Sequence, residues 1–187
     1  MEKKEIGFVE SSHPILEIAY KPSQTVRYVL EKKSLKYAIG IATLGGFSST
    51  LSGYIGTKYN YSFTFMDILI SSFSIGAVVT LLSILLLAII LTYAGRFLKG
   101  KGTFKEMLKG VCLTSIPYIW ILPLLLFWMQ FAPQSFFILP GVDNVLFDVI
   151  LQFFGSFILL VVAIWSFVIH IKVIWKQTGN KNSILKL

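Results

Sequence analysis

Few residues of this sequence have the types and the spacing that catalysis or metal binding requires. The single cysteine, Cys112, lies in an apolar stretch and has no second cysteine with which to form an internal disulfide. His170 lies in another apolar stretch, without a second His, Cys or carboxylate at the spacing of metal ligands. The sequence contains no H-E-x-x-H motif, no G-x-S-x-G motif and no paired catalytic carboxylates. We therefore predict a protein that is not an enzyme and that has no metal ion or other cofactor.

A phosphate-binding loop is suggested by the pattern G-x-x-x-x-G-K, which runs from Gly95 to Lys101. However, Gly102 occupies the position of the magnesium-binding Ser or Thr, and the pattern follows a long apolar run instead of a strand. We therefore do not expect a nucleotide site. The alternative is a flexible basic hairpin whose lysines attract anionic phospholipid headgroups.

Asp148 is the only acidic residue within the long apolar stretches, and Gln152 follows one helical turn later. An acidic residue inside a membrane is a candidate proton or cation site, which would favour a transporter or channel. Because Asp148 lies near the end of its stretch, its side chain would also have access to water, so an ordinary interfacial residue is the alternative.

The elements that carry these residues are predicted to be membrane-spanning helices. Residues 68–92 contain no Asp, Glu, Lys, Arg or His, and as a helix they would be about 37 Å long, which exceeds the ~30 Å hydrocarbon layer of a bilayer. The whole chain of 187 residues is 55% hydrophobic and 14% charged, against about 25% charged in soluble domains. We predict an all-α, polytopic transmembrane helical bundle with four spans, at residues 37–55, 68–92, 107–131 and 149–173.

Polar segments flank this predicted transmembrane domain of residues 37–175. Residues 1–36 show no cleavable signal peptide. After Pro22, the residues Val26, Val29 and Leu30 fall on one face at helical spacing, which predicts a short helix that lies in the membrane interface. Residues 176–187 form a polar tail.

Small residues four positions apart occur in the first two predicted spans, and this spacing lets helix backbones approach closely in lipid. We predict that the two spans pack against each other through these faces. The same faces would also suit contact between two copies of the chain, so a homo-oligomer is an alternative. The residues concerned are Gly45, Ser49 and Gly53 in the first span and Ser72 and Gly76 in the second.

The third predicted span has a clear start and two expected kinks. Thr103 followed by Glu106 forms a capping box, which predicts a helix that begins at Phe104. Pro117 and Pro123 lie inside the span, and each removes a backbone hydrogen bond and should kink the helix.

The basic residues indicate how the spans are oriented. The net charge is +8, and 16 of the 17 Lys and Arg residues lie before the first span, between the second and third, or from Lys172 onward. The positive-inside rule therefore places both termini in the cytoplasm, with the plasma membrane as the expected location. The basic residues form no aromatic-interleaved face, so nucleic acid is not an expected partner.

Three stretches resemble the bacterial branch of the Yip domain family, named for Ypt-interacting proteins. HPILEIAYKPSQTVRYVLE is similar to the family's amino-terminal stretch, with a Pro-x-x-x-x-Arg element at Pro22 and Arg27. WSFVIHIKVIWKQTGNKNSILKL resembles the end of the family's fourth span and the link beyond it. GRFLKGKGTFKEMLKGVCLTSIPYIW is similar to a Gly-rich hairpin that runs into a helix with an internal Pro, here at Gly95, Arg96, Gly100, Gly102, Thr103 and Pro117.

The resemblance implies a helical membrane bundle with a cytoplasmic amino terminus. Eukaryotic relatives are membrane proteins of vesicle traffic that interact with Rab-type GTPases, and some bacterial relatives resemble accessory subunits of ABC exporters. The family usually has five spans, so on this resemblance the chain lacks the last span. We expect an integral membrane protein that acts by interaction with other membrane proteins, as a scaffold or accessory subunit. A small transporter or channel for ions or small solutes is the alternative.

Overall fold

The computed structural model describes residues 13–57, 64–97, 102–137 and 146–178, and every regular element in these ranges is an α-helix. The predicted all-α class is therefore confirmed. The helices are α1 (Pro14–Glu17), α2 (Pro22–Lys32), α3 (Leu35–Ser52), α4 (Phe65–Phe97), α5 (Phe104–Leu113), α6 (Ile116–Phe131), α7 (Pro133–Phe136) and α8 (Leu146–Thr178).

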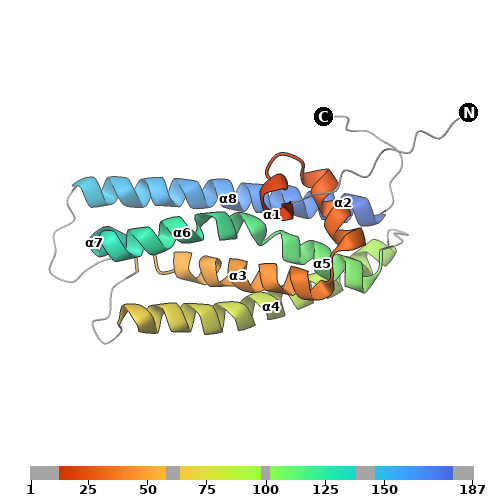
Figure 1. The fold of residues 1–187 in the computed structure, drawn as a ribbon, viewed down its shortest axis with the longest axis horizontal. Helices are drawn as coiled ribbons and strands as arrows, with labels where there is room; N and C mark the ends of the chain where they lie inside the picture. Colours follow the sequence, from red (N-terminus) through yellow and green to blue (C-terminus); the bar gives the residue numbers. More distant parts are fainter. Residues whose placement is uncertain (1–12, 58–63, 98–101, 138–145, 179–187) are drawn as a thin grey trace, which may run out of the picture.

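The helices α3, α4 and α8 and the consecutive pair α5–α6 lie side by side along the long axis of the molecule (Figure 1). The short helices α1 and α2 lie across one half of this bundle, over α8 and α5. The last turn of α4 and the first turn of α5 are at the same end, whereas α7 and the first turn of α4 are at the opposite end.

Three stretches are long and apolar enough to cross a membrane: Phe65–Phe97, Phe104–Phe131 and Val149–Lys176. They coincide with the second, third and fourth predicted spans. The first predicted span corresponds to α3, which does not reach the same apolarity because Gly, Ser and Thr replace large apolar residues in its second half. With 18 residues α3 would be about 27 Å long, close to the ~30 Å hydrocarbon thickness.

The third predicted span consists of two helices, and the break between them is at Thr114 and Ser115. A kink inside the span was predicted at Pro117. In the structure this proline lies in the first turn of α6, directly after the break, where its missing N–H group is tolerated. Pro123 lies inside α6 without ending it. The capping box predicted from Thr103 and Glu106 is confirmed, since both of its reciprocal hydrogen bonds are present at the start of α5.

Candidate functional site: the amino-terminal cap and the helix break beneath it

We call α1 and α2 together the amino-terminal cap. The helix predicted after Pro22 is confirmed as α2, and Val26, Val29 and Leu30 are all buried. However, these side chains join the core formed with α5 and α8, so the apolar face that we expected in the membrane interface contacts the bundle. Burial of one such side chain away from water stabilises the packed state by about 1.5–3 kcal/mol.

The first helix of the cap is attached to the bundle by apolar packing and by a hydrogen bond. Ile18 is fully buried in the same core as α5 and α8. Trp120 of α6 donates a hydrogen bond from Nε1 to the backbone oxygen of Ile15 at 3.0 Å. This contact joins segments 105 residues apart in the sequence and holds α1 beside the first turns of α6.

Lys109 of α5 fixes the end of α2. This lysine is only 8% exposed, and its Nζ donates a hydrogen bond to the backbone oxygen of Leu30 at 2.8 Å. Leu30 lies in the last turn of α2, where carbonyl groups lack helical partners and the helix dipole is negative. A buried cation is costly without a partner, so this hydrogen bond ties the position of α2 to that of α5.

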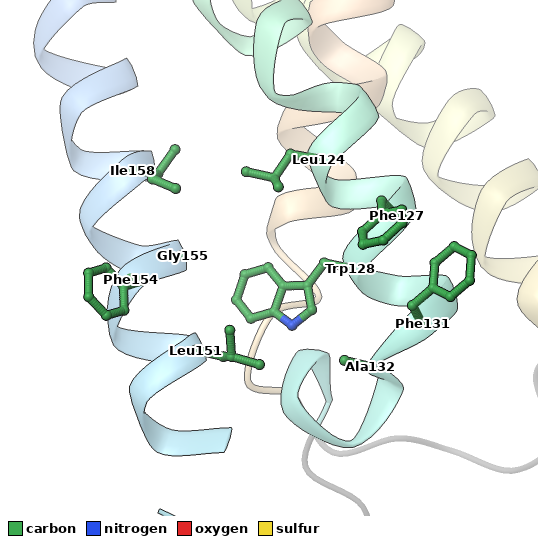
Figure 2. A pocket seen from close by; sticks show the side chains of 9 residues that line it. All are labelled: Leu124, Phe127, Trp128, Phe131, Ala132, Leu151, Phe154, Gly155 and Ile158. Atoms are coloured by element: carbon green, nitrogen blue, oxygen red, sulfur yellow. The ribbon is translucent and has the colours of Figure 1, made fainter. Parts of the chain in front are cut away.

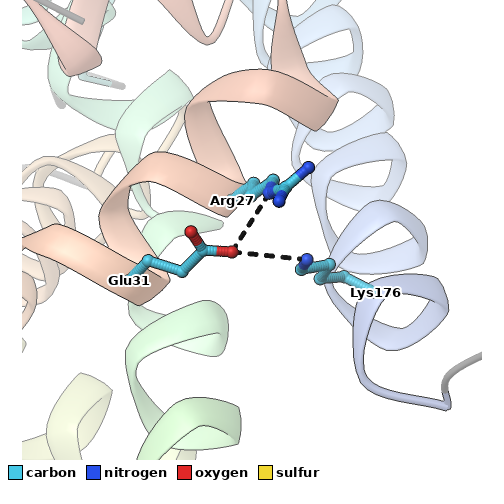
Figure 3. Close-up of polar contacts among 3 residues, drawn as sticks. All are labelled: Arg27, Glu31 and Lys176. Carbon is cyan, nitrogen blue, oxygen red and sulfur yellow. Dashed lines mark hydrogen bonds and ion pairs between the residues drawn. The ribbon is translucent and has the colours of Figure 1, made fainter. Parts of the chain in front are cut away.

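An exposed ion-pair network connects the cap to the end of α8 (Figure 3). The Oε1 atom of Glu31 accepts from Nε of Arg27 at 3.1 Å, one turn earlier on α2, and from Nζ of Lys176 at 3.5 Å. Exposed pairs of this kind contribute about 0–1 kcal/mol, so their effect is chiefly to neutralise charge and to orient the side chains.

The break between α5 and α6 is supported by two serines from neighbouring helices. Ser166 of α8 donates to the backbone oxygen of Thr114 at 2.7 Å, and Ser48 of α3 donates to that of Tyr118 at 2.6 Å. An interrupted helix in an apolar environment needs such donors, because no water is present to satisfy its carbonyl groups. Nothing in the sequence identified Ser48 and Ser166 as these donors.

The small-residue contact between α3 and α4 is centred on Gly46 and Gly76. A Cβ atom built on Gly76 would lie 2.6 Å from the backbone oxygen of Gly46, and one built on Gly46 would lie 2.7 Å from that of Gly76. Of the predicted residues on α4, Ser72 and Gly76 are both buried. The face of α3 that contacts α4 is shifted by one residue from the predicted face. Gly45 is packed against Ser115, and Ser49 and Gly53 are exposed.

The residues that carry the family resemblance gather at the half of the bundle that holds the cap. Pro22 begins α2 and Arg27 is on its exposed face. Thr103 is the N-cap of α5, with Gly102 directly before it. Gly95 and Arg96 are in the last turn of α4, Pro117 is buried at the helix break, and Gly100 is outside the described residues.

A separate pocket of about 240 Å³ lies between α6 and α8, near α7 (Figure 2). No polar surface lines it. Gly155 is part of its wall, and a Cβ atom there would lie 2.1 Å from the Trp128 ring, so the glycine makes room for that side chain.

Gln152 is half-buried on α8, whereas the side chain of Asp148 is outside the described residues. The described ranges hold no group of three or more His, Cys, Asp or Glu side chains that could bind a metal ion.

Most of the chain matches the model of a known protein family. Residues 16–180 match the model of the Yip1 domain, a range that includes the cap, the helix break and the end of α8. No curated protein and no solved structure matches the chain. Yip1 proteins are multi-pass membrane proteins that act in membrane trafficking by interaction and are generally not enzymes. Because the match covers far more than half of the sequence, this chain belongs to the Yip1 domain family.

Proposed function

We propose that this protein acts by binding other membrane proteins, as a scaffold or accessory subunit of a complex in the plasma membrane. An ABC-type exporter is one such complex. The contacts would be made within the bilayer by the outer faces of the long helices α4 and α8, and the basic end of the bundle would be in the cytoplasm.

One observation carries the proposal. In their most apolar stretches, only 22% of the α4 residues and 17% of the residues of the Val149–Lys176 span are buried within the molecule. The equivalent value for the Phe104–Phe131 span is 56%. Two helices therefore leave most of their apolar surface to the bilayer, which gives the helices of another membrane protein broad faces on which to pack.

The distribution of charge supports the proposed orientation. All ten described Lys and Arg residues lie in the cap or directly beside its helix α2, in the first turn or turns of α3 and α5, or in the last turns of α4 and α8. These segments are in one half of the bundle (Figure 1). Since cationic residues remain on the cytoplasmic side, four antiparallel spans that include α3 would have both termini there.

Site-specific photocrosslinking in native membranes tests the proposal. A photoreactive residue at Val78 of α4, which is 59% exposed, should form adducts with one or a few defined proteins. The matched control is Ala88 on the same helix, which is fully buried and should form none. The adducts at Val78 should disappear after the membranes are dissolved in strong detergent.

Two results would contradict the proposal. One is that Val78 and Phe157, an exposed residue of α8, form adducts only with lipid. The other is that the protein, extracted in mild detergent, is a monomer with no co-purifying membrane protein. The transport alternative, which was based on Asp148 and Gln152, receives no support from the pocket between α6 and α8, because that pocket is lined by apolar groups.

A further inference from the structure

We propose that the pocket between α6 and α8 holds one acyl chain of a membrane phospholipid. The pocket has a volume of about 240 Å³. Its lining comes from the second half of α6, from Ala132 directly after it, and from the first half of α8 (Figure 2).

The pocket opens on the outer surface of the bundle. Phe127, Phe131 and Phe154 are 61%, 70% and 57% exposed and form its rim. The rings of Phe127 and Phe131 pack on each other, with their centroids 4.4 Å apart. By contrast, Trp128 and Gly155 are buried, and the Trp128 ring lies in the space between the two helices (Figure 2). A group that enters from the bilayer would therefore meet the Trp128 ring inside.

The polar groups nearest to the pocket are already paired with one another. Nε1 of Trp128 donates to Oγ of Ser135 at 2.7 Å. The backbone oxygen of Ala132 accepts from the N–H groups of Ser135 and Phe136, and that of Trp128 accepts from the N–H group of Ala132. A buried water needs about two to four polar partners, which these walls do not offer. The pocket therefore fits a hydrocarbon and not water.

The depth of the pocket is that of acyl chains. Its α8 residues run from Leu151 to Ile158, and the membrane-spanning stretch begins just before them at Val149. They cover about 10 Å of the helix axis, which lies within the ~15 Å of hydrocarbon in one leaflet. The basic residues of α8, Lys172 and Lys176, are at the other end of the helix. The pocket is thus in the leaflet opposite the basic end of the bundle.

The size of the pocket favours an acyl chain over a part of another protein. An apolar cavity of about 150 Å³ accepts a benzene molecule, so a single aromatic side chain would leave part of this larger space empty. Empty space forfeits dispersion contacts along its walls. A whole helix, about 10 Å wide, would not fit between α6 and α8. An acyl chain is narrow and flexible, and the exposed rings of the rim are already in contact with such chains in a bilayer.

Photolabelling of the purified full chain tests this inference. The protein is placed in liposomes of phosphatidylcholine that carries a diazirine in one acyl chain, and the adducts are mapped by mass spectrometry. Trp128 is only 9% exposed, so an acyl chain reaches it through the pocket. We expect adducts at Trp128 at a level comparable to that at Phe127. The internal control is Val162, which is 6% exposed on α8 and outside the pocket, and which should form none.

A variant that fills the pocket should remove this labelling. Leu124 lines the pocket, so Leu124→Trp should lower the adducts at Trp128 to the background seen at Val162. The matched control is Leu160→Trp, the same change at an exposed position of α8 that does not line the pocket, which should leave the adducts unchanged. Thermal unfolding would show whether Leu124→Trp is folded. If it is not, the comparison of Trp128 with Val162 in the wild type decides the question.

Two results would overturn the inference. One is labelling of Phe127 without labelling of Trp128 in the wild type, which would leave a side chain of another protein as the occupant. The other is equal labelling of Trp128 in the two folded variants. The inference does not rest on a protein partner, because the liposomes contain only this chain and lipid, whereas protein adducts at Val78 are measured in native membranes. Failure of one experiment therefore leaves the other result standing.

Discussion

The hydroxyl group of Ser166 supplies a hydrogen bond to the backbone of the neighbouring span where that span is interrupted. In Ser166→Ala the carbonyl group of Thr114 would lose this partner in a buried environment. We expect this change to lower the free energy of unfolding by about 1–3 kcal/mol. Thermal or denaturant unfolding of the purified protein would measure the effect.

The matched control for this prediction is Ser156→Ala on the same helix. Ser156 is exposed and donates none of the side-chain hydrogen bonds seen in the described part of the chain. Its replacement should change stability by less than about 0.5 kcal/mol. Equal effects of the two substitutions would show that the bond to Thr114 does not stabilise the helix break.

At the scale of single residues, local patterns were predicted well and long-range partners were not. The capping box at Thr103 depends on residues close in the sequence, so its formation could be predicted. The hydrogen bond from Lys109 to Leu30 joins residues 79 positions apart. Nothing in the sequence around Lys109 distinguishes it from the exposed lysines nearby, because its burial depends on where α2 docks.

At the scale of helices, the approach of α3 to α4 depends on the absence of a side chain at Gly76. In Gly76→Ala the new Cβ atom would lie 2.6 Å from the backbone oxygen of Gly46, so the two helices would have to separate. We expect a loss of about 1–3 kcal/mol in the free energy of unfolding, which is typical of an overpacked contact. Unfolding in detergent would measure it.

Gly95→Ala is the control on the same helix, since a Cβ atom there would meet no other atom within 4 Å. Because alanine favours the helical conformation over glycine, this variant should be unchanged or more stable by up to about 1 kcal/mol. A Gly76→Ala variant as stable as Gly95→Ala would contradict the close packing of α3 and α4.

The register of this contact shows what helix periodicity can and cannot predict. The four-residue spacing predicted contact faces at Ser72 and Gly76 on α4 and at Gly45, Ser49 and Gly53 on α3. Ser72 and Gly76 are buried, whereas Ser49 and Gly53 are exposed. Because Gly45 and Gly46 are adjacent, spacing alone could not decide which of them faces α4. The neighbouring α5–α6 segment decides it, since Ser115 occupies the space beside Gly45.

The docking of the cap gives a second prediction at the scale of helices. In Lys109→Met the carbonyl group of Leu30 would lose its donor, so α2 should be held less firmly on α5. We expect hydrogen exchange in Pro22–Lys32 to become faster by about tenfold to a hundredfold, which corresponds to the ~1.5–3 kcal/mol of a hydrogen bond to a charged group.

Lys105→Met is the matched control for the cap, because Lys105 is an exposed residue on the same helix and no hydrogen bond or ion pair joins it to the cap within the described ranges. It should leave exchange in α2 unchanged. Equal exchange rates in both variants and the wild type would show that Lys109 does not anchor α2.

At the scale of the whole molecule, composition and hydropathy predicted the helical class and three of the long apolar helices. The arrangement of the cap could not be predicted in the same way. The amphipathic pattern of α2 suits a lipid interface and a protein groove equally well, and the choice depends on whether α5 and α8 leave an apolar groove beside it. The residues that form this groove are more than 70 positions away from α2 in the sequence.

The most direct test of the proposed membrane arrangement is the labelling of single cysteines in intact cells with a maleimide that cannot cross membranes. In a Cys112→Ser background, Lys105→Cys marks the basic end of the bundle and Gln134→Cys, an exposed residue of α7, marks the opposite end. We predict that Gln134→Cys is labelled in intact cells and that Lys105→Cys is labelled only after the membrane is permeabilised. Labelling of Lys105→Cys in intact cells would contradict the arrangement.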